Sequence, residues 1–259
     1  MNRSTPSIAI IGAGIGGLAV STCLRKLGIE TTIYEQAPAF ARVGSGIQMS
    51  PNAMRVLYGL GVGQQIRESA FEPPHWRNRE HDTGKLTNDH PLGPDAFDRY
   101  GVPYILMHRG DLHAALYGLV PDKTIRYSHK LCGLDQSDVG VKLDFENGES
   151  ATFDLVIASD GVHSPVRGWM LGKEEPRFTG RMAYRTAFPS NLMHGYDLMD
   201  DCAKWWGPDR HIVIYYVTAA RDEIYFTTSQ PEPEFRVESW SEIGDLTALR
   251  DAFSDFHPD

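Results

Sequence analysis

The chain has 259 residues, of which 41% are hydrophobic and 23% charged, an ordinary globular composition with enough length for one large domain or two modest ones. A formal net charge of −9, with no run of about 18 apolar residues, argues against nucleic acid, an anionic membrane or a membrane span. The three cysteines are widely spaced and form no CxxC pair, which argues against structural zinc and favours a cytoplasmic location, so we expect no metal site.

The first element expected along the chain is a β-α-β unit built around a glycine-rich turn. Ser7–Ile11 is a short apolar run typical of a buried strand, and residues 18–27 have the pattern of a helix. Between them lies Gly12-Ala-Gly-Ile-Gly-Gly17, and a second strand over residues 31–34 ends in the acid Glu35. This order of strand, glycine turn, helix, strand and acid is typical of dinucleotide-binding units.

Each position of the turn has a physical reason. Gly12 lets the strand turn tightly, Gly14 lets a pyrophosphate approach the backbone, and Gly17 lets the helix pack close to the sheet. The carboxylate of Glu35 can accept hydrogen bonds from ribose hydroxyls. The alternative is a tight strand–helix turn that binds nothing. The residues predicted to bind the cofactor here are Gly12, Gly14, Gly16, Gly17, Glu35 and Gln36.

The next segments are less regular. Residues 37–54 read as a loop followed by a helix, with Ser50-Pro51 at the helix start. Residues 71–101 are polar and rich in Pro, His and Asp, which predicts irregular strands and loops. A further helix is expected to open at His108-Arg109-Gly-Asp-Leu112, with Asp111 as its N-cap.

Strand patterns dominate from residue 124 to residue 160. Asn147-Gly148 is a strong hairpin turn signal. Leu155–Ala158 is a continuous apolar run, which predicts a strand buried on both faces. It leads to Asp160, at the carboxyl end where ligands of open α/β sheets gather, and a carboxylate is costly there unless it is used.

An antiparallel sheet is expected beyond residue 179, followed by a helix and a short tail over residues 245–259. In the strand expected over residues 211–217, His211 and Tyr215 share one face, because side chains alternate along a strand. A face with two titratable groups suits the floor of a pocket. The alternative is that His211 caps a surface turn and Tyr215 packs in the sheet.

The motifs taken together resemble the single-component FAD-dependent aromatic-ring hydroxylases. They are Gly12–Gly17 with Glu35, Arg42-Val-Gly-Ser-Gly-Ile47, His108–Leu112 and Ala158–Arg167. The resemblance implies an α/β fold: a three-layer Rossmann-like FAD-binding domain with an inserted antiparallel-sheet substrate domain. It implies domains at 1–178, with a substrate-side insertion around 71–101, and at 179–259. It also implies FAD and NADH or NADPH as cofactors, with flavin or pyrophosphate contacts at Arg42, Arg109 and Asp160.

The resemblance further implies that the protein uses O₂ to hydroxylate a hydroxylated aromatic or pyridine carboxylic acid. Cys202-Ala-Lys-Trp-Trp206 and Asp209–Tyr216 are most similar to members that act on a pyridine carboxylic acid, which implies substrate or catalytic roles at Cys202, His211 and Tyr215. Taken alone, Cys202 reads more readily as a small buried hydrophobe than as a site residue. Gln48 stands where those members have histidine, and glutamine cannot act as a base near neutral pH. We therefore expect Gln48 to influence substrate choice and proton handling.

Two other readings stay open. A NAD-dependent dehydrogenase shares the β-α-β unit, but Arg109 and the Asp160-Gly161 stretch would have no role in it. The family's later Gly-Asp motif, which contacts the flavin, has no counterpart before Asp259, so we expect the C-terminal flavin segment to be absent. The third reading is therefore non-catalytic: a flavin-free fragment that folds, with oligomer formation as an option, and has no activity.

Overall fold

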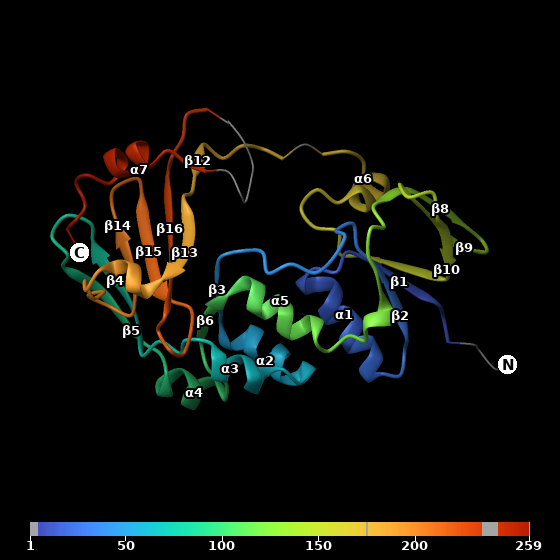
Figure 1. Ribbon diagram of the computed structural model, residues 1–259, viewed down its shortest axis with the longest axis horizontal. Helices are drawn as coiled ribbons and strands as arrows, with labels where there is room; N and C mark the ends of the chain where they lie inside the picture. The colour runs from blue at the N-terminus through green and yellow to red at the C-terminus, as the bar shows by residue number, and fades with distance from the viewer. Residues whose placement is uncertain (1–4, 175, 235–242, 259) are drawn as a thin grey trace. The chain divides into compact units, whose positions relative to one another are not determined.

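The structure, a computed structural model, describes residues 5–174, 176–234 and 243–258. Contacts divide the chain into two compact units, Met1–Arg42 with Leu112–Pro176 and Val43–Asp111 with Arg177–Asp259 (Figure 1). The whole of residues 43–111 therefore belongs with the second unit, whereas the predicted ranges place only an insertion around 71–101 on the substrate side. The physical reason is strand pairing, because β4 (His75–Glu80) lies beside β14 (Cys202–Trp206) in one sheet.

The first unit contains a parallel sheet with the strand order β11-β1-β2-β7. Its strands are β1 (Ile8–Ile11), β2 (Thr31–Tyr34), β7 (Ile125–Arg126) and β11 (Leu155–Ala158). An antiparallel sheet has the order β10-β9-β8, with β8 (Leu131–Ser137), β9 (Gly140–Phe145) and β10 (Ser150–Phe153). The unit also holds α1 (Ile15–Lys26), the 3₁₀ turn η1 (Asp122–Thr124) and α6 (Pro165–Leu171). The expected α/β fold with a strand–turn–helix–strand start is confirmed.

The core of the first unit joins its two sheets. Tyr34 at the end of β2 stacks on Phe145 of β9, with 4.4 Å between ring centroids. Ala9, Leu143 and Val166 belong to the same buried cluster. Each of these apolar side chains is removed from water, which is the main favourable contribution to folding.

Two local expectations in the first unit have different outcomes. The Asn147-Gly148 turn is confirmed, because β9 and β10 form a hairpin around it and Gly148 has φ +86°. The expectation that Leu155–Ala158 is buried on both faces is wrong. β11 is the outermost strand of its sheet, and the Leu155 side chain is 48% exposed. A continuous apolar run does not distinguish a central strand from an outer one.

The second unit is built on an antiparallel sheet with one parallel pair, β14 with β4. The strand order is β12-β16-β15-β14-β4-β5, and β13 also pairs with β16. The remaining strands are β5 (Leu86–Pro91), β12 (Arg181–Met182), β13 (Arg185–Pro189), β15 (His211–Tyr216) and β16 (Glu223–Pro231). A two-stranded ribbon pairs β3 (Gly46–Met49) with β6 (Ile105–His108). Figure 1 shows β13, β14, β15 and β16 side by side.

The helices of the second unit follow the sequence expectations only in part, because a helix over Pro94–Tyr100 begins at a proline within residues 71–101, where only irregular strands and loops were expected. They are α2 (Pro51–Leu60), α3 (Gly63–Ser69), α4 (Pro94–Tyr100) and α7 (Leu246–Ala252), and a 3₁₀ turn, η2, spans Ser190–Met193. Pro51 is the first residue of α2, as expected. α5 runs from Arg109 to Tyr117, so the predicted N-cap role of Asp111 is wrong: Asp111 lies inside the first turn.

The C-terminal helix α7 is shorter than residues 245–259, and position 259 lies outside the described residues. The Asp245 side chain caps it by accepting hydrogen bonds from the backbone N–H groups of Thr247 and Ala248. The tail then packs on the sheet, where His257 stacks on Trp205 with 5.7 Å between ring centroids. Side chains alternate between the two faces of a sheet along each strand, so Trp205 and Cys202 of β14 point to opposite faces. The tail therefore covers the face opposite Cys202.

No helix within the described ranges is long and apolar enough to cross a membrane.

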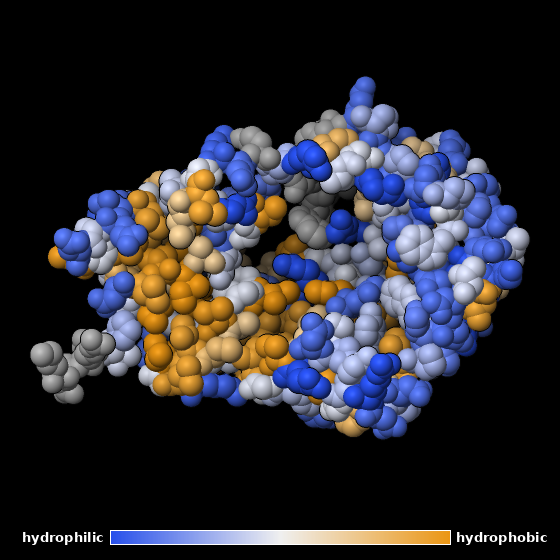
Figure 2. Space-filling model, turned by 180° about the vertical axis from the view of Figure 1, so that it is seen from behind, coloured by the Kyte–Doolittle hydropathy of each residue, from blue (hydrophilic) through white to orange (hydrophobic). Residues whose placement is uncertain are grey.

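Apolar surface around β11 predicts self-association of the chain. Figure 2 shows hydrophobic side chains gathered on one part of the molecule, and the exposed large apolar residues include Leu155, Met170 (72%) and Leu171 (77%). An outer strand beside such residues favours contact with another molecule. Light scattering should show oligomers that decrease when Met170 and Leu171 are both changed to Gln. The control is Val139→Gln, an apolar residue in the β8–β9 turn that is 85% exposed. A monodisperse wild-type monomer would contradict the prediction.

Candidate functional site

The glycine turn between β1 and α1 has no room for side chains at two positions. Gly12 has φ +98°, and a Cβ there would lie 2.5 Å from the carbonyl oxygen of Ser159. A Cβ at Gly17 would overlap the carbonyl oxygen of Gly12. The tight turn expected at Gly12 and the close packing expected at Gly17 are therefore confirmed.

Gly14 has the opposite environment. It is the N-cap of α1, and nothing lies within 4 Å of the position that a Cβ would occupy. The first N–H groups of a helix lack partners inside the helix and carry the positive end of its dipole. The open space at Gly14 therefore lets an anion approach these N–H groups directly.

Glu35 is tied to the glycine turn by its carboxylate. Oε2 accepts a hydrogen bond from the backbone N–H of Ala13 at 2.8 Å, and Oε1 accepts one from Ala37 at 2.8 Å. Each carboxylate oxygen still has capacity for another donor. The bond to Ala13 fixes the distance between the acid and the turn, and the ribose contact stays a prediction.

A pocket of about 500 Å³ opens beside this turn. Asp160 lies on its wall, and its Oδ2 accepts a hydrogen bond from the Val166 N–H at 3.2 Å, so the carboxylate has a local structural partner. The argument that Asp160 ends a buried strand is wrong, because β11 is an outer strand. The pocket is lined by Ile11, Gly12, Gly14, Tyr34, Glu35, Gln36, His129, Lys130, Leu131, Ser159, Asp160, Gly161, His163 and Pro165.

Sequence reasoning missed His129 and Lys130 as lining residues. They lie just before β8, in a segment with no motif of its own. His129 contacts the Tyr34 ring at 5.3 Å between centroids, and its Nε2 lies 3.1 Å from a Glu149 carboxylate oxygen. These residues reach the pocket because the His129 backbone N–H donates to the Glu35 carbonyl at 2.9 Å, a contact that no local pattern predicts.

The other predicted cofactor residues are placed as follows. Gly16 is exposed in the first turn of α1. Arg42 is exposed at the end of a segment of the first unit, whereas Arg109 belongs to the second. Arg109 packs against Gly44: a Cβ placed on Gly44 would lie 3.1 Å from the Arg109 Cβ. The backbone N–H of Arg109 donates to the Ser45 carbonyl at 2.7 Å. Flavin contacts at these positions stay predictions.

The second unit gathers a cluster of buried polar side chains on one sheet face. Tyr215 lies opposite Cys202 on β14 and opposite Tyr225 on β16, so all three side chains share that face. All three are at least 95% buried, and the two tyrosine rings are 5.1 Å apart between centroids. A Cβ at Gly46 would overlap the Tyr225 ring and lie 2.8 Å from the Tyr215 hydroxyl. Gly46 thus lets both rings pack directly on β3.

Gln48, also on β3, links two of the tyrosines. The Tyr104 hydroxyl donates a hydrogen bond to Gln48 Oε1 at 2.9 Å. A side-chain hydrogen bond between Gln48 and Tyr215 lowers the Tyr215 pKa, against the larger effect of burial. Gln48 is itself exposed, so this bridge lies at the surface of the cluster.

Burial sets the protonation of this cluster. It raises the pKa values of Tyr104, Tyr215 and Cys202, and for Tyr215 it outweighs the opposing effect of the Gln48 bond. The two phenols and the thiol are therefore neutral near pH 7. Tyr104 was not predicted; it precedes β6 in an apolar stretch, and only the pairing of β3 with β6 brings it to Gln48.

His211 lies at the other end of the same face, opposite Trp206 on β14 and Ser229 on β16. Desolvation lowers the His211 pKa, and the positive charges of Lys204 and Arg181 add to this effect. The resulting pKa is about 4. Four residues of strand separate His211 from Tyr215, about 13 Å between Cα atoms. The structure therefore brings together three of the four predicted catalytic residues, Cys202, Tyr215 and Gln48, and places His211, a neutral imidazole, apart from them.

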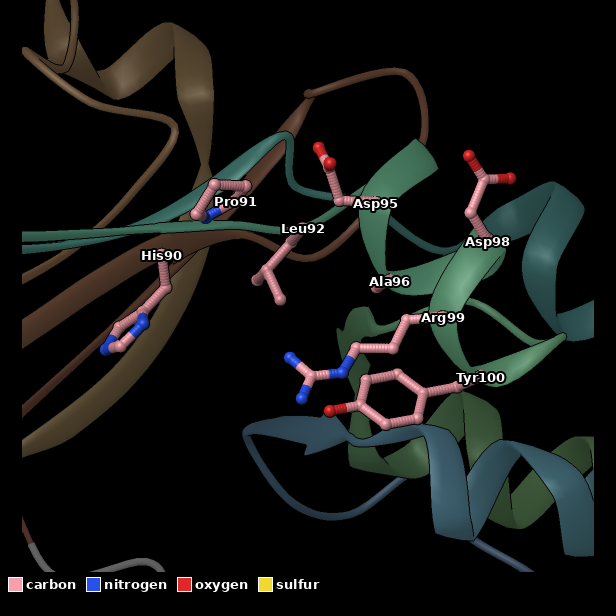
Figure 3. A pocket seen from close by; sticks show the side chains of 8 residues that line it. All are labelled: His90, Pro91, Leu92, Asp95, Ala96, Asp98, Arg99 and Tyr100. Atoms are coloured by element: carbon pink, nitrogen blue, oxygen red, sulfur yellow. The ribbon is translucent and has the colours of Figure 1, made fainter.

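A second pocket lies between the end of β5 and α4, with a volume of about 670 Å³ (Figure 3). Its acidic side chains, Asp95 and Asp98, project from α4, and the Arg99 guanidinium lies over the Tyr100 ring at 5.4 Å. No predicted site residue lines it. The described part of the chain also holds no group of three or more His, Cys, Asp or Glu side chains that could bind a metal.

The family match and the two relatives described below are all flavin-binding or monooxygenase proteins. A family described as "FAD binding domain" matches residues 5–184. The chain is 38% identical over 257 residues to 6-hydroxynicotinate 3-monooxygenase of Bordetella bronchiseptica, covering 99% of this chain and 67% of that protein. It is 37% identical over 256 residues to the enzyme of the same name from Pseudomonas fluorescens, covering 98% and 66%. The chain thus spans about two thirds of the length of these relatives.

Among solved structures, the chain is similar to HpxO of Klebsiella pneumoniae complexed with FAD and uric acid. The TM-score is 0.84 at 24% sequence identity, and the match covers 97% of this chain and 63% of that one. At this identity the likeness supports the fold.

Two glycine variants should separate binding from folding in the first unit. Gly14→Val places a side chain in the open approach to α1, so FAD binding should be lost while the circular dichroism spectrum and thermal unfolding stay unchanged. Gly17→Ala introduces a Cβ that overlaps the Gly12 carbonyl, so it should lower the unfolding temperature as well. Titration calorimetry with FAD and thermal unfolding of both variants test this. Unchanged FAD affinity in Gly14→Val would refute the assignment.

The lowered pKa of His211 predicts a pH-dependent stability. The unfolded chain binds a proton at His211 near its ordinary pKa of 6.5, and the folded chain resists protonation until about 4. The free energy of unfolding should therefore fall as the pH drops from about 6.5 toward 4. In urea unfolding at about pH 7 and about pH 4.5, His211→Gln should lose less stability than wild type, whereas the exposed control His90→Gln should behave like wild type. Equal losses in all three proteins would be inconsistent with this assignment.

Proposed function

We propose a function from one premise: the chain belongs to the FAD-dependent aromatic-ring hydroxylase family. In the proposed reaction one atom of O₂ enters the ring of a hydroxylated aromatic or pyridine carboxylic acid, and the other leaves as water. NADH or NADPH supplies the two electrons. The observation that carries the proposal is the cluster of Cys202, Tyr215 and Gln48, completed by Tyr104, on one face of the second unit's sheet.

The residues of the first unit fit FAD. Gly14 and the N-terminus of α1 would hold the pyrophosphate, and Glu35 would accept hydrogen bonds from the adenosine ribose. Gln36 and Asp160 line the same pocket. FAD supplies the redox chemistry with oxygen that protein side chains lack.

The side chains of the second unit would bind and orient the ring. The neutral Tyr215 hydroxyl would donate a hydrogen bond to a ring hydroxyl or its oxyanion. Removing the proton of the ring hydroxyl makes the ring electron-rich, and a neutral His211 can accept a hydrogen bond or a proton. The neutral Cys202 thiol is a small wall of the site rather than a nucleophile.

The finer proposal is decarboxylative hydroxylation of a substrate like 6-hydroxynicotinate, as in nicotinate degradation. The identity of 37–38% to two enzymes of that name supports it. A salicylate-type hydroxylase is the alternative, because Gln48 replaces a histidine that can titrate with an amide that cannot. The non-enzymatic alternative is a fragment that does not hold FAD, which the visible spectrum of the purified protein would reveal.

The role of His211 is tested in the FAD-loaded protein. His211→Ala should slow single-turnover hydroxylation by about 10²- to 10⁴-fold if His211 acts as acid or base. The flavin spectrum should be intact, because the proposed FAD contacts lie elsewhere. Normal turnover would remove His211 from the mechanism, and loss of the flavin spectrum would mark the residue as structural.

Gln48→His is the companion variant for substrate choice. If Gln48 selects a different ring, the variant should turn over 6-hydroxynicotinate faster than wild type, because histidine restores a titratable group at that position. Initial rates with 6-hydroxynicotinate and with salicylate give the comparison. An unchanged ratio of the two rates would show that position 48 has no part in selection.

A further inference from the structure

Lys204 lies on the same sheet face as the tyrosine cluster. On β14 it alternates with Cys202 and Trp206, and it pairs in register with Val213 of β15. Because side chains alternate along a strand, Lys204 projects between the levels of His211 and Tyr215. The cation therefore stands midway along the face to which the proposed function assigns the substrate.

An aromatic ring with a fixed orientation holds the ammonium. Lys204 Nζ lies 3.6 Å from the centroid of the Trp206 ring, within range of a cation–π interaction. The Trp206 indole N–H donates to Asn78 Oδ1 at 3.1 Å, and the His211 ring lies 5.2 Å from the Trp206 ring between centroids. The lysine side chain is thus positioned by a ring that is itself positioned by a hydrogen bond.

This lysine has no counter-ion among the residues that the structure describes. Lys130 and Lys142, by contrast, pair with Glu146 at 2.8 Å and with Asp144 at 2.9 Å. Lys204 is partly buried, and desolvation lowers its pKa. A cation that is partly removed from water without a carboxylate partner costs stability, and a bound anion would offset that cost.

We propose that the Lys204 ammonium binds the carboxylate of the substrate and makes this face select an aromatic acid over the matching neutral amide. The inference rests on the proposed function for the aromatic ring of the ligand. The binding of an anion at Lys204 is argued from the lysine itself. The rest of the chain carries a net negative charge, so recognition of an acid requires a local cation such as this one. The cluster at Tyr215 would then receive the ring hydroxyl, at a distance from the carboxylate set by the strand register.

The experiment compares acids with amides in equilibrium binding, followed by the tryptophan fluorescence of the FAD-loaded protein. The probes are 6-hydroxynicotinate and salicylate, each with its carboxamide. Wild type should bind at least one acid about 10- to 100-fold more tightly than its amide, the range expected for a charge-assisted hydrogen bond. Lys204→Met keeps the length of the side chain and should abolish this preference, whereas Lys204→Arg should retain most of it.

The control is Lys85→Met, which makes the same change of net charge in the exposed β4–β5 turn and should leave the preference unchanged. A lysine that merely covers Trp206 would lower the thermal stability of Lys204→Met without changing the acid-to-amide ratio. A preference that persists in Lys204→Met, or a wild type that binds acid and amide equally, overturns the proposal. The two proposals can fail separately. If Lys204→Met loses the preference but the FAD-loaded wild type performs no hydroxylation with NADH and O₂, the anion site is supported and the proposed function is refuted.

Discussion

The second unit depends on the absence of a side chain at Gly46. The rings of Tyr215 and Tyr225 occupy the space that a Cβ there would need, so β3 lies directly against the sheet face. That close approach brings the neighbouring Gln48 within hydrogen-bond reach of Tyr104 and Tyr215. It also joins residues 43–111 to the later sheet, two stretches far apart in the sequence. A glycine in what reads as a flexible loop thus has a packing role.

The sequence predicted the local features well because their causes are local. The glycine turn, the helix start at Pro51 and the Asn147-Gly148 hairpin each follow from backbone requirements over a few residues. The tyrosine cluster could be predicted only in part. Cys202 came from the resemblance, and Tyr215 came from strand alternation as well as the resemblance. Nothing near Tyr104 or Lys204 in the chain indicates what they contact, because strand pairing decides it.

The wrong expectations have the same origin. The run Leu155–Ala158 has the apolar composition of a central strand, yet the sheet order makes it an outer one. The predicted N-cap at Asp111 failed because α5 begins two residues earlier, at the end of β6. In both cases the local pattern was read correctly, but its position in the sheet or at the helix end depends on neighbours distant in sequence.

The protonation states on the sheet face form a consistent set. Desolvation, together with the charges of Lys204 and Arg181, keeps His211 neutral, and burial keeps the hydroxyls of Tyr104 and Tyr215 protonated. Near pH 7 the face then presents hydrogen-bond donors together with the cations of Lys204 and Arg181, the second of which donates to Ser229 beside His211. A hydroxylated aromatic acid has complementary groups: a carboxylate for the cations and a hydroxyl for the phenols. The Gln48 amide does not titrate, so the charge at position 48 does not change with pH. A histidine there would change its charge near neutral pH.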